Sequence, residues 1–172
     1  MFFGPTPAPV DRIPYHLGFM TSDLEAAMEQ LGTTFATRWT PLQSAEDLTF
    51  STGDGPSARF STRTVHSAGH QAMHLEVVEG SAGSIWHTDA IVALHHLAYW
   101  SPDVAADVDA LREQGWELEL TALDDDGRPT RFAYLSKAGL TRIEMVGLAR
   151  QPSYSELVED DVPTYPFPRP TP

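Results

Sequence analysis

The amino-acid sequence predicts an α+β fold in which two tandem βαβββ modules form one curved eight-stranded sheet around a single cleft. Two observations lead to this prediction. A block of twelve residues recurs at a constant offset along the chain, and each copy is followed by a helical pattern and three strand-like segments. The expected parts are an N-terminal arm (1–11), module 1 (12–79), a linker (80–93), module 2 (94–148) and a Pro-rich acidic C-terminal tail (149–172).

The repeated block spans residues 15–26 and 95–106 and aligns without a gap at an offset of 80 residues. Histidine occupies the second position of both copies, as His16 and His96, and several other positions differ only by conservative changes. Self-similarity of this kind indicates one supersecondary unit that is used twice.

Each block combines a strand with the start of a helix. Residues 13–20 and 94–100 mix β-branched, aromatic and apolar types, which is typical of strands. The Ser and Asp residues that follow can accept the free N–H groups of a first helical turn, and apolar residues then recur at helical spacing. Gly32 and Gly115 are expected to end the two helices.

Three strand-like segments follow each helix and are separated by turns rich in Gly and Asp. The expected strands are 35–42, 58–66 and 71–79 in module 1, and 116–122, 130–136 and 140–147 in module 2.

The last strand of each module carries one glutamate in an otherwise apolar centre. A pseudo-twofold between the modules would bring their first and last strands to one point. A lone histidine in a strand is more often structural than a ligand, but buried carboxylates tend to be paired or coordinated. Two nitrogen and two oxygen donors suit a divalent ion such as Zn, Fe, Mn, Co, Ni or Mg. We therefore expect one metal site formed by His16, Glu76, His96 and Glu144; the alternative is a degenerate site that binds an organic ligand without metal.

Across residues 12–148 the sequence resembles the vicinal oxygen chelate superfamily, which includes glyoxalase I, methylmalonyl-CoA epimerase, bleomycin-resistance proteins and extradiol dioxygenases. In that family each module lends one metal ligand from its first strand and one from its last, which implies the same four ligands. The segment SIWH (84–87) looks most like the branch of the superfamily that contains methylmalonyl-CoA epimerase. This chain has Glu76 at a position where those epimerases carry a Gln. The resemblance rests on the segments HLGF (16–19), LEVV (75–78), LHHLAY (94–99) and IEMV (143–146).

Several other residues are candidates for the walls of a substrate site, although packing or surface ladder pairs would give the same pattern. Arg59 and Arg131 lie on corresponding strands and would suit a carboxylate clamp. His95 is expected to pack behind the ligands because it points to the opposite face from His96. The expected substrate-binding residues are Trp39, Arg59, His74, Trp100, Arg131 and Tyr134, whereas His66, His70 and His87 are expected at the surface.

The ligand set favours a divalent-metal-dependent lyase, isomerase or epimerase that acts on a small carbonyl compound through a metal-stabilised enolate. Glu76 or Glu144 would be the catalytic base. The alternatives are an extradiol-type ring-cleaving dioxygenase and a non-catalytic, drug-sequestering protein that binds an aromatic ligand.

Composition limits the partners. The chain has 172 residues and a formal net charge of −13, which disfavours nucleic acids and acidic membranes. It has no cysteine, so a thiolate metal site is excluded, and no apolar run approaches the roughly 20 residues that a membrane span needs. We expect a cytoplasmic homodimer that binds a small-molecule carbonyl substrate.

Overall fold

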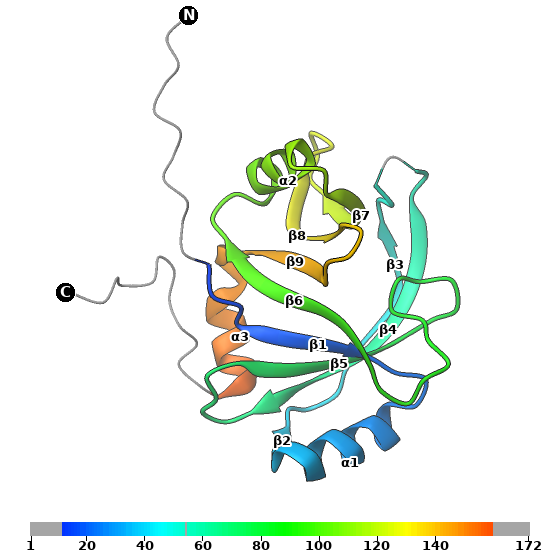
Figure 1. Cartoon of the computed structure of the whole chain (residues 1–172), viewed down its shortest axis with the longest axis vertical. Helices are drawn as coiled ribbons and strands as arrows, with labels where there is room; N and C mark the ends of the chain where they lie inside the picture. Colours follow the sequence, from blue (N-terminus) through cyan, green and yellow to red (C-terminus); the bar gives the residue numbers. More distant parts are fainter. Residues whose placement is uncertain (1–11, 54, 160–172) are drawn as a thin grey trace, which may run out of the picture.

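The computed structural model describes residues 12–53 and 55–159 (Figure 1). The expected N-terminal arm (1–11) and the final part of the expected tail (160–172) lie outside the described residues. The elements in chain order are β1 (His16–Met20), α1 (Leu24–Phe35), β2 (Arg38–Trp39), β3 (Gln43–Phe50), β4 (Ala58–Ala68), β5 (His74–Gly80), β6 (Ala93–Ser101), α2 (Val104–Glu113), β7 (Glu117–Leu123), β8 (Pro129–Ser136), β9 (Arg142–Gly147), the 3-10 helix η1 (Leu148–Arg150) and α3 (Gln151–Val158).

The strands form one mixed sheet whose order is β2-β4-β5-β1-β6-β9-β8-β7, with β3 paired to β4. The first strands of the two modules, β1 and β6, are antiparallel neighbours at its centre. Each is flanked by the last strand of its own module, since β5 runs parallel to β1 and β9 runs parallel to β6. This symmetric arrangement confirms the predicted α+β fold of two βαβββ modules.

The sheet curves so that β3 on one side approaches β7 on the other (Figure 1). Backbone N–H groups of Ser51 and Thr121 donate to each other's carbonyl oxygens at 2.9 and 3.0 Å, which joins the end of β3 to β7. The concave face therefore surrounds a cavity that β1 and strands β3 to β9 border.

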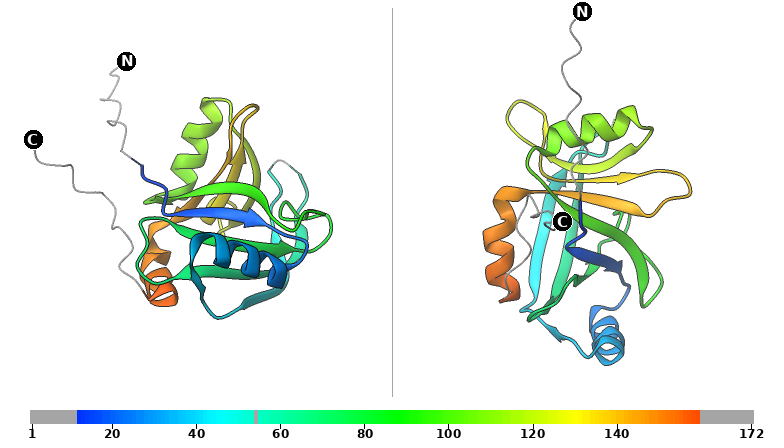
Figure 2. Two further views of the ribbon diagram at one scale, coloured as in Figure 1. Left: turned by 60° about the horizontal axis from the view of Figure 1, so that its bottom comes forward. Right: turned by 60° about the vertical axis from the view of Figure 1, so that its left-hand side comes forward.

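Helices α1 and α2 cover opposite ends of the convex face (Figures 1 and 2). Asp23 and Asp103 cap them by accepting hydrogen bonds from the amides three residues on, at 2.9 and 3.0 Å. The buried side of α1 packs against Val65 and Val77, whose neighbours along the strands point to the concave face. None of the α-helices in residues 12–53 and 55–159 combines the length and hydrophobicity needed to cross a membrane.

The expected strand at 35–42 is wrong. Helix α1 continues past Gly32 to Phe35, so that only Arg38–Trp39 remain extended, and the long strand of this region is Gln43–Phe50. Most of its side chains are exposed and polar, because β3 is an edge strand with one paired neighbour along most of its length. It therefore lacks the apolar alternation by which strands are recognised.

The prediction that the chain leaves the core at residue 149 is also wrong for residues 149–158. Helix α3 packs against the core through Val158, which is fully buried, and through Tyr154. The amide of Gly69 donates to the carbonyl of Val158 at 3.0 Å and ties the end of the helix to the loop after β4. The ordered domain therefore includes a C-terminal helix beside the concave face.

Candidate metal centre

The four repeat-equivalent side chains come together on the concave face. They project from the four central strands and are all buried. One ligand atom from each residue lies within 4.8 Å of the others, and the group consists of His16 on β1, Glu76 on β5, His96 on β6 and Glu144 on β9. Among the described residues, the sequence-based ligand set is thus brought to a single point.

The distances between these atoms suit one shared ion. Nε2 of His16 and Nε2 of His96 are 2.8 Å apart, and Oε2 of Glu144 is 3.3 Å from each. Oε2 of Glu76 is 3.3 Å from His96 Nε2 and 3.6 Å from His16 Nε2. Bonds of about 2.0–2.2 Å to one ion place neighbouring donors about 2.8–3.6 Å apart. The buried Oε2 of Glu76 also has no hydrogen-bond partner in the described part of the chain, as a coordinating oxygen would.

Gly18 makes room for one of these ligands. It lies opposite His96 in the β1–β6 pair, and a Cβ atom there would be 2.6 Å from Nε2 and closer still to two other ring atoms. The equivalent residue of the second module is Ala98, which lies opposite His16. Only the first module therefore requires glycine at this point.

A chain of hydrogen bonds fixes the tautomer of His96. Nε2 of His95 lies 2.8 Å from the carbonyl oxygen of Ile85, which can only accept, so this nitrogen carries a proton. Burial, followed by the charges of His96 and Arg142, lowers the pKa of His95 to about 3, so the ring is neutral and its Nδ1 accepts. Nδ1 of His96, at 2.9 Å, must then donate, which leaves the lone pair of His96 Nε2 facing the centre.

His66 belongs to the site although it was expected at the surface. Strand β4 runs on to Ala68, so His66 is not at its end; it pairs in register with Glu76 and is buried. Its Nε2 lies 3.3 Å from Oε1 of Glu76, whereas Oε2 of the same carboxylate is the atom near His16 and His96. The sequence signal that could identify His66 is its place on the strand that precedes, and is expected to pair with, the strand carrying Glu76.

The imidazoles keep both carboxylates ionised. Burial alone would raise the pKa of Glu76, but His16, His66 and His96 outweigh it and lower the value to about 2. Burial is likewise outweighed at Glu144, where hydrogen bonds from His16 and His96 hold the pKa well below its usual range. Burial lowers the pKa of His16, so a neutral imidazole is available as a donor to a metal.

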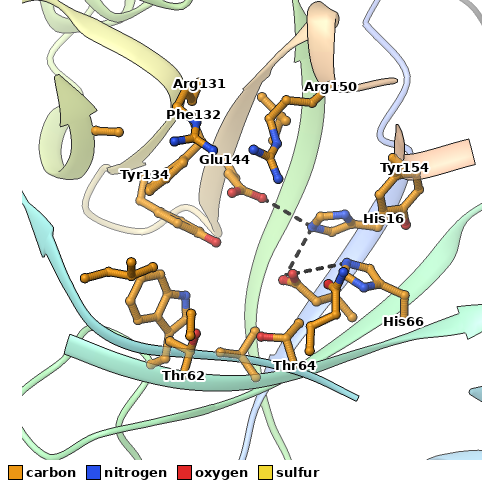
Figure 3. A pocket seen from close by; sticks show the side chains of 18 of the residues that line it. His16, Thr62, Thr64, His66, Arg131, Phe132, Tyr134, Glu144, Arg150 and Tyr154 are labelled. Atoms are coloured by element: carbon orange, nitrogen blue, oxygen red, sulfur yellow. Dashed lines mark ion pairs between the residues drawn. The ribbon is translucent and has the colours of Figure 1, made fainter. Parts of the chain in front are cut away.

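A cavity of about 660 Å³ is lined by three of the four ligands, His16, Glu76 and Glu144. Figure 3 shows His16 and Glu144 among its lining residues. Its volume lies within the range of small-molecule sites. The rings of Tyr15 and Trp100 stack at 3.8 Å on one wall, and Tyr154 of α3 packs edge-on against Tyr15. Burial, with the nearby carboxylate charges, raises the pKa of Tyr134 and Tyr154, so both phenols stay protonated.

Three of the six expected substrate-binding residues line this cavity, namely Trp100, Arg131 and Tyr134. Trp39 does not, because it lies under α1 and its indole N–H donates to the carbonyl of Met28. Arg59 and His74 also lie outside the cavity lining.

Arg59 is 64% exposed and pairs with Asp47 at 3.0 Å, so the predicted clamp of Arg59 with Arg131 does not form. His74 is buried outside the cavity lining, where its Nδ1 donates to the carbonyl of Ser67 at 2.8 Å. The alternation of side chains along a strand predicts which face each residue occupies, but it does not predict how far along the strand the cavity extends.

Solved structures share this fold. Methylmalonyl-CoA epimerase from Mycobacterium tuberculosis is 20% identical, with a TM-score of 0.54 over 78% of this chain and 86% of that chain. A variant of the Streptomyces coelicolor methylmalonyl-CoA epimerase, in complex with 2-nitronate-propionyl-CoA, is 19% identical, with a TM-score of 0.52 over 81% of this chain and 98% of that chain. A mutant 4-hydroxymandelate synthase from Streptomyces coelicolor is 18% identical, with a TM-score of 0.51 over 79% of this chain and 38% of that chain.

A search of curated proteins finds no match. The model of the Glyoxalase/Bleomycin resistance protein/Dioxygenase superfamily matches residues 15–134, which include both modules' first strands and the linker. This match agrees with the paired βαβββ modules and with the buried His/Glu group between them. The chain belongs to the glyoxalase/bleomycin resistance protein/dioxygenase superfamily.

Proposed function

We propose that this protein is a divalent-metal-dependent isomerase, epimerase or lyase that removes a proton from the carbon next to a carbonyl group. The observation that carries the proposal is the buried group of His16, Glu76, His96 and Glu144 at the base of a cavity of substrate size. When bound, a divalent ion would chelate adjacent oxygens of the substrate and disperse the negative charge of the enolate.

The protein's own residues would hold the ion and move the proton. His16 offers a neutral nitrogen, His96 offers the Nε2 that faces the centre, and the two ionised carboxylates complete the set. With a pKa of about 2, Glu76 is a weak base, so proton removal depends on the acidification of the carbon-bound hydrogen that chelation supplies. His66, 3.3 Å from Oε1 of Glu76, is placed to share the proton that Glu76 receives.

The symmetry of the two carboxylates supports an isomerase or epimerase in particular. Glu76 and Glu144 come from equivalent strands of the two modules, and both contribute an Oε2 atom to the shared point. In an epimerisation one group removes a proton from one face of the substrate carbon and another returns a proton to the opposite face. Two carboxylates related by the pseudo-twofold suit these two roles.

Proton exchange in deuterated water tests this proposal. We expect zinc- or cobalt-loaded protein to exchange the α-proton of methylmalonyl-CoA, the substrate named for its structural relatives, or a C3 proton of 2-oxobutanoate, as followed by NMR. Glu76→Gln and Glu144→Gln should each lower the exchange rate about 100-fold or more. Glu29→Gln, at an exposed residue of α1, is the matched control and should leave the rate unchanged.

Undiminished exchange in both glutamine variants would contradict the proposal, as would the absence of exchange with both compounds in metal-loaded wild type. The two alternative functions give other signals. Oxygen-dependent cleavage of a catechol by iron-loaded protein would identify a ring-cleaving dioxygenase, which uses two histidines and a single carboxylate. Tight binding of an aromatic ligand without turnover would identify a sequestering protein.

A further inference from the structure

Two arginines line the same cavity as His16, Glu76 and Glu144, namely Arg131 from β8 and Arg150 from the end of η1. Neither guanidinium has an ion-pair partner among residues 12–53 and 55–159. Both residues are exposed, in a chain whose Asp and Glu residues outnumber Lys and Arg by 24 to 11. Four other arginines do have carboxylate partners: Arg12 with Asp107, Arg59 with Asp47, Arg63 with Glu25, and Arg142 with Glu119.

A local irregularity of β8 brings Arg131 to the cavity. Thr121 of β7 pairs with Ala133, but the next residue of β7 pairs with Thr130, so Arg131 and Phe132 form a bulge. Arg131 has a φ of 60°, in the left-handed region that an arginine rarely adopts. Bulges next to functional sites redirect side chains, and here the bulge directs Arg131 to the cavity wall.

Arg150 reaches the cavity from the other side of Glu144. It lines the cavity together with the stacked rings of Tyr15 and Trp100. Figure 3 shows Arg131 and Arg150 on the same side of the cavity as Glu144. Two strands and a helix thus converge to place two positive charges beside the carboxylate.

With one divalent ion bound, the charges of the site would favour an anionic substrate. Glu76 and Glu144 contribute two negative charges, which one divalent ion would neutralise. Arg131 and Arg150 then leave two positive charges, which match one carboxylate of a substrate together with the charge of its enolate. Guanidinium groups recognise carboxylates through planar, charge-assisted hydrogen bonds.

We propose that Arg131 and Arg150 bind a free carboxylate of the substrate, so that the substrate is a carboxylate-bearing carbonyl compound. Phe132 and Trp100, which line the cavity, would contact its apolar part. The carbonyl half of this statement rests on the proposed function, whereas the carboxylate half rests on the two arginines alone. The pair replaces the clamp of Arg59 with Arg131 that the sequence suggested.

Matched probes test the carboxylate site without turnover. The full-length protein as purified is titrated calorimetrically at low ionic strength with 3-phenylpropanoate and with the neutral 3-phenylpropanamide. We expect wild type to bind the acid about tenfold more tightly than the amide. Arg131→Gln and Arg150→Gln should each remove this preference by weakening only the binding of the acid. Arg59→Gln should leave both affinities unchanged, because its guanidinium lies outside the cavity.

Equal binding of acid and amide by wild type, no binding of either, or a preference that survives in both cavity variants would overturn the proposal. Inorganic phosphate that displaces the acid at a concentration below that of the acid would also overturn it, in favour of a phosphate site. Metal content is measured on the same samples. A protein that prefers the acid but takes up no divalent ion when it is loaded retains the carboxylate site and refutes the proposed function. A protein that takes up a divalent ion but does not prefer the acid retains the proposed function and refutes the carboxylate site.

Discussion

His96 can approach the other ligands because the residue opposite it has no side chain. Replacement of Gly18 by alanine would place a Cβ atom inside the His96 ring and displace that ring. We therefore expect Gly18→Ala to lower zinc affinity about 100-fold or more in a competition titration with a chromogenic chelator. The matched change in the second module, Ala98→Gly, removes a methyl group opposite His16 and should leave zinc affinity within about threefold of wild type. Equal affinities in both variants would show that His96 does not need this space.

His95 should affect metal binding without contacting the metal. His95→Phe removes the acceptor that holds the proton on Nδ1 of His96, so the tautomer with a free Nε2 lone pair is no longer favoured. Loss of such a partner typically costs about 10–100-fold in metal affinity, and we expect a loss in this range by isothermal titration with zinc. His87→Phe, at an exposed histidine of the linker, should bind zinc as wild type does. An unchanged zinc affinity in His95→Phe would refute the hydrogen-bond chain.

At the scale of the elements, α3 forms one wall of the site. The ring of Tyr154 contacts the rings of Tyr15, His16, His66, His74 and Trp100. Tyr154→Ala should therefore lower the free energy of unfolding by about 2–4 kcal/mol in urea denaturation. Tyr154→Phe keeps the ring and removes a buried hydroxyl that has no hydrogen-bond partner in the described part of the chain, so it should cost less than about 1 kcal/mol. Similar losses in the two variants would show that the hydroxyl, and not the ring packing, stabilises α3.

The elements that repeat were predictable, and those that do not repeat were not. Strands β1 and β6 and the capped helices after them share one pattern at two places, so each copy supported the other. Gln43–Phe50 has no apolar alternation because its side chains are mostly exposed. Gln151–Val158 stands at the start of the proline-rich C-terminal stretch, a composition that favours irregular backbone over a helix.

The site divides in the same way. His16, Glu76, His96 and Glu144 occupy equivalent points of the repeat, so their meeting could be predicted. His66 has no repeat partner of the same type, since Tyr134 pairs with Glu144 as His66 pairs with Glu76. Arg150 lies beyond the last strand of its module. Their contributions depend on where β4 and β9 end, and periodicity does not specify strand ends.

For the whole molecule, the buried titratable groups make stability depend on pH. His95 has a pKa of about 3 in the folded protein against about 6.5 when unfolded, so between these values the unfolded chain binds a proton that the folded chain does not. Glu76, at about 2 in the folded protein against about 4.3 unfolded, adds stability above pH 4.3 that is lost as the pH falls toward 2. Both groups act in the same direction.

Acidification of metal-free protein from pH 7 to pH 4 should therefore lower the free energy of unfolding, with His95 contributing up to about 1.4 kcal/mol per pH unit below 6.5. Urea denaturation at a series of pH values measures this slope. In His95→Phe the slope between pH 6.5 and 4 should be smaller. A stability that is constant or rises over this interval in wild type would contradict the assignment of a neutral, buried His95.

The superfamily fold places its pseudo-twofold axis at the centre of the molecule, between β1 and β6. The ligands come from both sides of this axis, so neither module holds a complete site alone. The described residues of one chain therefore offer one candidate metal site at this axis. The homodimer and the cytoplasmic location expected from the sequence stay predictions.

The metal content of the purified protein tests this central claim most directly. Elemental analysis by inductively coupled plasma mass spectrometry, after dialysis against a mixture of divalent ions, should find one ion per chain in wild type. His16→Ala and Glu144→Ala should each reduce this to well below one. Wild-type protein that retains no divalent ion, or variants that retain a full equivalent, would contradict the assignment of these four residues as a metal centre.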